Sequence, residues 1–222
     1  MAGDIFKSAL LLIAVSYLYG LDVPEEFMLE ADSLFNQGEE TPKTFVGVFK
    51  DDNDFTIYFA ATTRMFDYNI ESLKCYLTDV VGYQEYFSFI RRSEVVENYH
   101  NELDRKAYFS VAAAAFAKAL FIGSLDSVVN TDNEDVHIYY NKVHDEEMNK
   151  KYYDMERGIL KIEFHEFKMC FRLRKIDENK TNVMLTSVVS PKIWIPRWLF
   201  QITANSLFPR ILTDFKDWVN KN

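Results

Sequence analysis

The sequence predicts an α+β fold in which a curved antiparallel β-sheet is wrapped around a long C-terminal α-helix. First, residues 182–189 alternate apolar and β-branched side chains in the manner of a strand. Second, Pro191 and Pro196 separate this strand from an amphipathic helix that we expect to run to Val219, since proline is tolerated in a first helical turn. Third, much of the preceding chain reads as antiparallel strands joined by short polar turns.

The apolar face of the C-terminal helix is rich in aromatic residues, so it must pack on a large apolar surface. Pro209 lies inside this helix and removes one backbone hydrogen bond, so we expect a bend near residues 205–206. Such a bend would let the helix half-open over a pocket. The apolar stripe consists of Phe200, Ala204, Leu207, Ile211, Phe215 and Trp218.

The composition indicates one sizeable domain with an N-terminal extension. Hydrophobic residues occupy 48% of the 222 positions and aromatic residues 16%, which is enough for a core and for an apolar cavity within it. The net charge of -9 argues against a nucleic-acid partner, because phosphate contacts need a basic surface. Cys75 and Cys170 form no disulfide framework, and two independent thiols are favoured over a pair.

Three segments divide the chain. Residues 1–20 contain the apolar run Phe6–Tyr19, which has the length of a signal-peptide core and predicts a periplasmic or secreted protein. The alternative is a buried N-terminal hydrophobic helix in a cytoplasmic protein. Residues 21–43 are expected to form a short amphipathic helix and a polar linker, and residues 44–222 the main domain.

The order of elements within the main domain follows from periodicity. A helix is expected from Ile70 to about Tyr83, with Asn69 as its N-cap. The stretch Ala112–Leu120 is compatible with a strand end, a bulge or a helix, and Asp145–Lys151 reads as a charged loop. Strands are expected at residues 44–50, 55–63, 90–99, 106–113, 136–143 and 182–189.

Residues 159–176 are too long for an ordinary unbent strand. The apolar set changes phase at His165-Glu166, which predicts a bulge or bend between two strand segments. Arg172 and Arg174 alternate with apolar residues, and we expect them on a solvated face, with a cavity arginine as the alternative.

No motif for catalysis or for cofactor binding is present. The four histidines do not form a metalloprotease pattern, and the chain contains neither a phosphate-binding glycine loop nor a nucleophile elbow. We therefore expect no cofactor and no metal. His137 and Tyr139 lie two residues apart on one strand, so they either line a pocket together or form a pair at an edge or facing solvent.

At its C-terminal end the chain resembles the START-like lipid-binding superfamily, which has the helix-grip fold, and most closely its bacterial START-domain members. The resemblance covers roughly residues 45–222. It departs from related domains at Ala112–Asn130, which lacks their tryptophan-proline and arginine-aspartate pairs and leaves the ligand and the pocket mouth undefined. The resemblance is carried by Arg157–Glu163, Phe167–Ile176, the turn Asn179-Lys180, Asn182–Pro191 and Trp194–Leu199.

This resemblance implies a ligand cavity between the sheet and the C-terminal helix. It implies non-catalytic binding or transfer of a lipid or another hydrophobic small molecule, with transient membrane contact. Two alternatives stay open: a cavity enzyme of the cyclase or hydratase type, using His137, Tyr139 or Arg172, and an interaction protein with a filled core. The candidate cavity residues are His137, Tyr139, Phe167, Met169, Phe171, Val183, Leu185, Trp198, Phe200, Ala204 and Leu207.

Overall fold

The computed structural model describes residues 23–38, 40–97, 106–114, 117–130, 135–155 and 160–221. The signal peptide or hydrophobic helix expected at residues 1–20 lies outside these ranges. Within them, no helix combines the length and the apolar character needed to cross a membrane.

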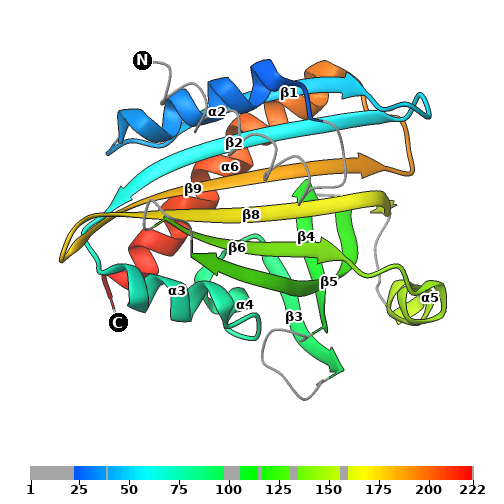
Figure 1. Cartoon of the computed structure of the whole chain (residues 1–222). Coiled ribbons are helices and arrows are strands. Elements are labelled where there is room, and N and C mark those ends of the chain that lie inside the picture. The colour runs from blue at the N-terminus through cyan, green and yellow to red at the C-terminus, as the bar shows by residue number, and fades with distance from the viewer. Residues whose placement is uncertain are drawn as a thin grey trace.

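Within the described residues the strands form one sheet of nine, in the order β1-β2-β9-β8-β6-β5-β4-β3, with β7 beside β5 (Figure 1). Neighbours on this path pair antiparallel, and only β7 pairs in parallel. The strands are β1 (Lys43–Lys50), β2 (Thr56–Phe66), β3 (Ile90–Glu97), β4 (Lys106–Ala114), β5 (Ala117–Asn130), β6 (Asp135–Lys142), β7 (Leu160–Ile162), β8 (Phe164–Asp177) and β9 (Lys180–Pro191).

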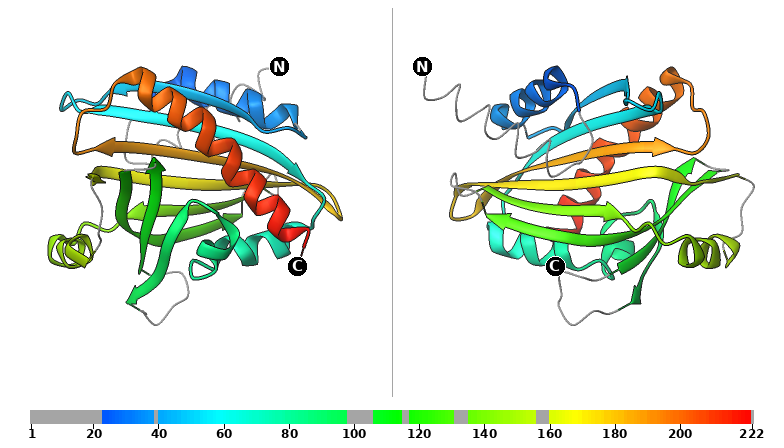
Figure 2. Two further views of the ribbon diagram at one scale, coloured as in Figure 1. Left: turned by 180° about the vertical axis from the view of Figure 1, so that it is seen from behind. Right: turned by 45° about the vertical axis from the view of Figure 1, so that its right-hand side comes forward.

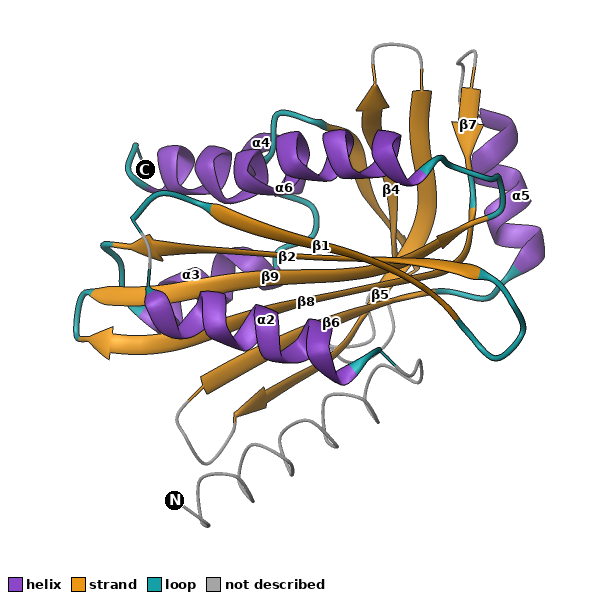
Figure 3. Cartoon of the chain, turned by 90° about the horizontal axis from the view of Figure 1, so that it is seen from above, coloured by secondary structure: helices purple, strands orange, loops and turns teal. Residues whose placement is uncertain are grey.

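Helices cover both faces of this sheet. The longest, α6 (Arg197–Val219), runs diagonally across the concave face (Figure 2). On the opposite face lies α2 (Glu25–Gln37), as the view from above shows (Figure 3). The remaining described helices are α3 (Ile70–Thr78), α4 (Tyr83–Tyr86) and α5 (Glu146–Met155). This arrangement confirms the predicted α+β class with a curved sheet around a long C-terminal helix.

The strand period of two sends alternate side chains into two separate clusters. On β8, Phe171 and Leu173 join the large cluster under α6, α3 and α4, whereas Cys170 joins a second cluster under α2. On β9, Leu185 faces α6 and Met184 faces α2. Because both faces are covered, the central strands are buried on both sides.

The C-terminal helix does not show the predicted bend. It continues as one helix through Pro209, and Figure 3 shows it as a nearly straight rod. The hydrogen bond that Pro209 cannot donate would reach the carbonyl of Asn205, a residue exposed on the outer side of the helix, where water can take that place. The proposal that the helix half-opens at this point therefore has no support.

The structure bears on three local predictions. Asn69 caps α3 by accepting a hydrogen bond from the Ser72 N–H at 2.8 Å, as expected. The pairing of β8 with β9 shifts register between Phe164 and Glu166, at the predicted bulge. The prediction of a charged loop at residues 145–151 was wrong, because most of this stretch belongs to α5. Asp145 caps that helix by accepting a hydrogen bond from the Met148 N–H.

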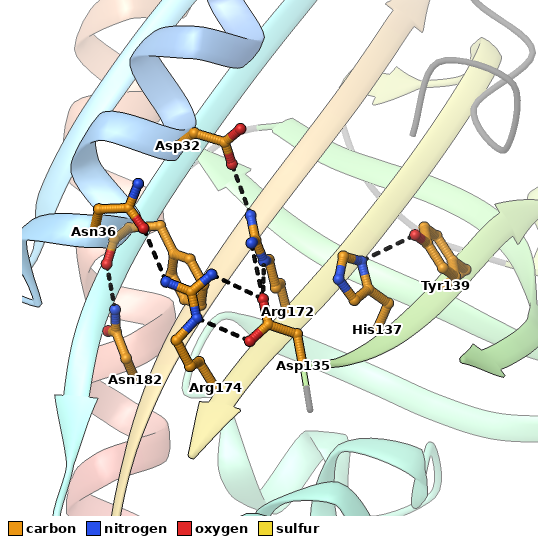
Figure 4. Close-up of polar contacts among 9 residues, drawn as sticks. Asp32, Asn36, Asp135, His137, Tyr139, Arg172, Arg174 and Asn182 are labelled. Carbon is orange, nitrogen blue, oxygen red and sulfur yellow. Dashed lines mark hydrogen bonds and ion pairs between the residues drawn. The ribbon is translucent and has the colours of Figure 1, made fainter. Parts of the chain in front are cut away.

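A buried ion-pair network joins α2 to the sheet (Figure 4). Asp135 on β6 is almost fully buried and accepts hydrogen bonds of 2.8–2.9 Å from Arg172 and Arg174 of β8. Arg172 also reaches Asp32 of α2 at 2.6 Å. Both guanidinium groups lie over the ring of Phe35, at 4.4 and 4.5 Å from its centroid.

The environment of these arginines differs from the expected solvated face. The Arg172 side chain is only 7% exposed, because α2 covers it. Burial by itself would raise the pKa of the Asp135 carboxyl, but hydrogen bonds and charge from the two arginines outweigh it and leave that pKa below its usual value. The network is therefore ionised, and it anchors α2.

Replacing Asp135 by asparagine is expected to lower the free energy of unfolding by about 3–5 kcal/mol, because it leaves the buried Arg172 charge without its main partner. Urea denaturation measures the change. The matched control is Glu71→Gln, which removes an exposed ion pair with Lys74 and should cost less than about 1 kcal/mol. Equal losses in the two variants would contradict this account of how α2 is held.

Candidate functional site

A cavity of about 180 Å³ lies between the concave face of the sheet and the N-terminal half of α6. Its walls come from the strands, from α4 and from the chain that links β9 to α6. The lining residues are Tyr58, Tyr83, Phe87, Phe89, Ile90, Phe109, Val111, Ala119, Tyr140, Ile162, Phe164, Phe167, Met169, Phe171, Leu185, Ser187, Val189, Pro191, Ile195, Phe200, Thr203, Leu207, Phe208 and Ile211.

The other half of the same interface is a filled core. Phe66 and Phe215 lie with ring centroids 5.4 Å apart there, and Leu73, Leu77 and Leu212 are fully buried. Close packing at the C-terminal end of α6 thus fixes the helix on the sheet. The N-terminal end spans the space that remains.

The cavity walls are apolar and carry no charged side chain. Three tyrosines line the cavity, and their hydroxyl groups bond within the protein. Tyr58 donates to the Ile195 carbonyl, while Tyr83 and Tyr140 each lie 2.5 Å from the Leu77 carbonyl. Burial raises the pKa of the Tyr83 phenol well above its ordinary value, so it remains a neutral group.

Solved structures with this architecture are known. Human STARD10 matches with a TM-score of 0.60 at 14% identity, over 90% of this chain and 81% of that protein. A STAR-related lipid transfer protein from Xanthomonas axonopodis matches with a TM-score of 0.58 at 13% identity, over 79% of this chain and 98% of that one. The chain has a START-like fold.

The START-like fold also occurs in an enzyme. The Zhui aromatase/cyclase from Streptomyces sp. R1128 matches with a TM-score of 0.55 at 12% identity, over 74% of this chain and 94% of that protein. At such identities the likeness concerns the fold alone. No family model matches the sequence, and no curated protein matches it.

The structure brings six of the eleven candidate residues together around the cavity. Val183 and Ala204 are buried but do not line it: Val183 packs in the filled part of the core. Trp198 points outward and is 62% exposed. The six residues that line the cavity are Phe167, Met169, Phe171, Leu185, Phe200 and Leu207.

His137 and Tyr139 lie on the opposite face of the sheet from the cavity. They are neither pocket-lining nor solvent-facing: both are buried, and Tyr139 belongs to the cluster that contains Met28, Ala31 and Phe35 of α2. His137 Nδ1 lies 3.0 Å from the Tyr139 hydroxyl (Figure 4). Arg172 shares this outer face, so all three residues named for an enzymatic alternative are separated from the cavity by the sheet.

Sequence reasoning missed much of the cavity wall. Tyr58, Phe89, Phe109 and Phe164 all line it, and all lie on or beside strands that were expected. Their alternation with polar residues predicts a buried face. It does not say which face of a doubly covered sheet meets the C-terminal helix.

An exposed apolar surface adjoins the cavity. Ile195 and Phe200 line the cavity, yet their neighbours in the chain point outward. We call these outward residues the junction patch: Ile193, Trp194, Trp198, Leu199 and Ile202, which are 38%, 80%, 62%, 41% and 62% exposed. Exposed aromatic and aliphatic residues so close together in the chain are typical of interaction surfaces.

The described residues offer no metal site, because no three His, Cys, Asp or Glu side chains gather in a way that could hold an ion. A second, polar groove lies beneath α5. In its wall the Lys192 ammonium and the Glu163 carboxylate neutralise each other in an ion pair of 2.7 Å.

The His137 imidazole gives a pH-dependent stability. Burial, together with the nearby Arg172 charge, lowers its pKa from 6.5 to about 4. Above pH 6.5 the folded and unfolded chains are both neutral at this residue. Below it only the unfolded chain takes up the proton, so stability falls as the pH drops toward 4.

We expect His137→Gln to flatten this dependence, because glutamine does not titrate. Between pH 7.5 and pH 5 the wild type should lose about 2 kcal/mol more than the variant, as measured by urea denaturation at each pH. Parallel stability curves for the two proteins would contradict a buried neutral imidazole.

Proposed function

We propose that this protein binds a lipid or another hydrophobic small molecule, without catalysis, in the cavity under α6. The observation that carries the proposal is the almost wholly apolar space of about 180 Å³ beneath α6, which is partly open. Well-packed interiors contain few voids larger than a water molecule. A cavity of this size and lining favours a ligand site over a filled core.

The size of the cavity supports binding energetically. A dry apolar cavity of about 150 Å³ in another protein is known to take up benzene. Each ligand methylene transferred from water into such a space contributes about 0.8 kcal/mol. A ring or a section of an acyl chain therefore gains several kcal/mol without any directional contact.

The same lining speaks against a cavity enzyme. General acid–base catalysis needs titratable groups within hydrogen-bonding reach of a reacting atom. Of the described residues that line the cavity, only tyrosines can titrate, and their hydroxyl groups bond to backbone carbonyls. His137, Tyr139 and Arg172 lie behind the sheet.

Transient contact with a lipid membrane belongs to this proposal. The junction patch presents two tryptophans, whose amphipathic indoles favour the membrane interface. Arg197, which is exposed, lies next to Trp198 and adds a positive charge that attracts anionic headgroups. The patch belongs to the segment that closes the cavity, so docking there would bring the cavity to the bilayer.

The binding proposal predicts that Val111→Phe fills the cavity. Purified wild type should bind the neutral fluorescent probe N-phenyl-1-naphthylamine with a one-to-one stoichiometry in a fluorescence titration. The variant should bind it at least about tenfold more weakly, because the added ring occupies the space that the probe needs. Its stability should change by less than about 1 kcal/mol, since the ring enters a void.

The matched control is Val143→Phe, which enlarges a partly buried valine in the cluster beneath α5, away from the cavity. This control should keep wild-type probe binding. Absence of probe binding by the wild type, together with a protein that carries no extractable lipid, would overturn the proposed function.

The membrane proposal predicts that the double variant Trp194→Ser/Trp198→Ser loses vesicle binding while it keeps probe binding. Sedimentation with phosphatidylcholine and phosphatidylglycerol vesicles measures the first, and we expect at least a fivefold loss of bound protein. The control, Leu29→Ser/Ile176→Ser, removes two side chains that are 51% and 50% exposed outside the patch. Equal losses in both double variants would show that general surface hydrophobicity, and not the junction patch, binds the membrane.

A further inference from the structure

Two hydroxyl groups in the cavity wall differ from the others. The wall contains five residues with a hydroxyl group. Three of them are tyrosines, whose hydroxyl groups donate hydrogen bonds to backbone carbonyls of the protein. Ser187 and Thr203 are the other two, and their side chains form no hydrogen bond with any residue that the structure describes. They are thus polar groups in an apolar space with unused bonding capacity.

The sheet holds the Ser187 side chain toward the cavity. Ser187 lies on β9 opposite Ala60 of β2 and Met169 of β8, so its backbone is fixed from both sides. The strand period puts it on the same face as Leu185 and Val189, which also line the cavity. The residue is only 6% exposed, and its hydroxyl oxygen is not among the fully buried side-chain atoms that lack a partner, so the surface that this oxygen keeps lies at the cavity.

A buried hydroxyl without a partner is unfavourable compared with an alanine of nearly the same shape. Two other serines on the sheet show the usual solution. Ser190, also on β9, donates to the Thr56 carbonyl, and Ser93 on β3 donates to the Val80 carbonyl. Ser187 lacks such an acceptor among the described residues. The buried hydroxyl of Ser110 on β4 lacks one too, but Ser110 does not line the cavity. Of these serines, Ser187 is therefore the one whose hydroxyl a cavity ligand reaches.

The charge of the wall restricts the ligand further. None of the lining side chains is acidic, basic or a histidine. Moving an ionised group into such a space without a counter-charge is strongly unfavourable. The portion of the ligand that enters the cavity must therefore be uncharged.

We propose that the ligand is an uncharged hydrophobic molecule with one hydroxyl or carbonyl group, which Ser187 binds from the sheet. Thr203 of α6 lines the same cavity and offers a second hydroxyl from the helix side. This inference rests on the proposed function and narrows it to a class of ligand. A buried polar partner gives selectivity, because a site that bonds a ligand hydroxyl loses affinity when that bond is removed.

The test compares matched eight-carbon probes, 1-octanol, octane and octanoate, by displacement of N-phenyl-1-naphthylamine. Ser187→Ala should weaken 1-octanol binding about tenfold, which corresponds to about 1.4 kcal/mol, and leave octane binding unchanged or tighter. Octanoate at pH 8 should bind the wild type at least about tenfold more weakly than 1-octanol does. The apo form of Ser187→Ala should melt at the wild-type temperature or above it, since an unsatisfied hydroxyl has been removed.

Ser190→Ala is the matched control, because its hydroxyl bonds within the protein and does not line the cavity. It should lower the melting temperature and leave the ratio of 1-octanol to octane affinity unchanged. Equal effects of Ser187→Ala on 1-octanol and octane would overturn the inference while the binding function stands. Octanoate binding as tight as 1-octanol binding would also overturn it, and failure of every probe, the fluorescent one included, would overturn both.

Discussion

The structure depends on one constraint: the central strands are covered by a helix on each face. On the concave side α6 closes the sheet, and on the other side α2 does so. Residues that alternate along β6, β8 and β9 therefore face two different buried environments. In either environment a polar group without a partner is unfavourable, so the face on which a side chain lies decides which partners it needs.

On the outer face this constraint produces the ion-pair network. Asp135, Arg172 and Arg174 carry charges that would normally lie in water, but α2 removes the water and supplies Asp32 in exchange. Removal of α2 would leave these charges exposed and the apolar cluster around Met184 uncovered. The helix and the network are therefore one structural unit, distinct from the cavity.

On the concave face the same closure produces the cavity. The aromatic pair Phe66 and Phe215 and its aliphatic neighbours fill one end of the space beneath α6. At the other end the helix departs toward the junction patch, and the side chains beneath it do not meet across the gap. The space beneath α6 therefore has a tightly packed end that fixes the helix and an open apolar end that can hold a ligand.

The fold was predictable from the sequence, because strand alternation, the two prolines of the junction and the helical stripe are local signals. The cavity was predictable in part. Leu185, Phe200 and Leu207 were identified because they belong to strong apolar rows that must face each other. His137 and Tyr139 were assigned to the cavity because the sequence does not show that α2 covers the second face of the sheet. On a covered face, a polar residue is as buried as a residue of the core.

Ser187 is a polar residue on the same face of β9 as Leu185 and Val189, and this interruption of an apolar row is visible in the sequence. A serine in an apolar row of a central strand indicates either a bond to the backbone or a ligand contact, and only the structure separates these two meanings. Helix α5 was missed for a different reason. Its charged surface and single buried residue, Tyr152, give too weak a periodicity to separate it from a loop.

The central claim is that the ligand binds in the cavity on the concave side of the sheet and not on the side that α2 covers. Two methionines report on the two sides: Met169 lines the cavity, and Met184 belongs to the cluster under α2. Methyl NMR of ¹³C-methionine-labelled protein, titrated with 1-octanol, should shift and saturate the Met169 methyl signal at one ligand per chain while the Met184 signal stays in place. A saturable shift confined to Met184, or no saturable shift at either methyl, would contradict the account.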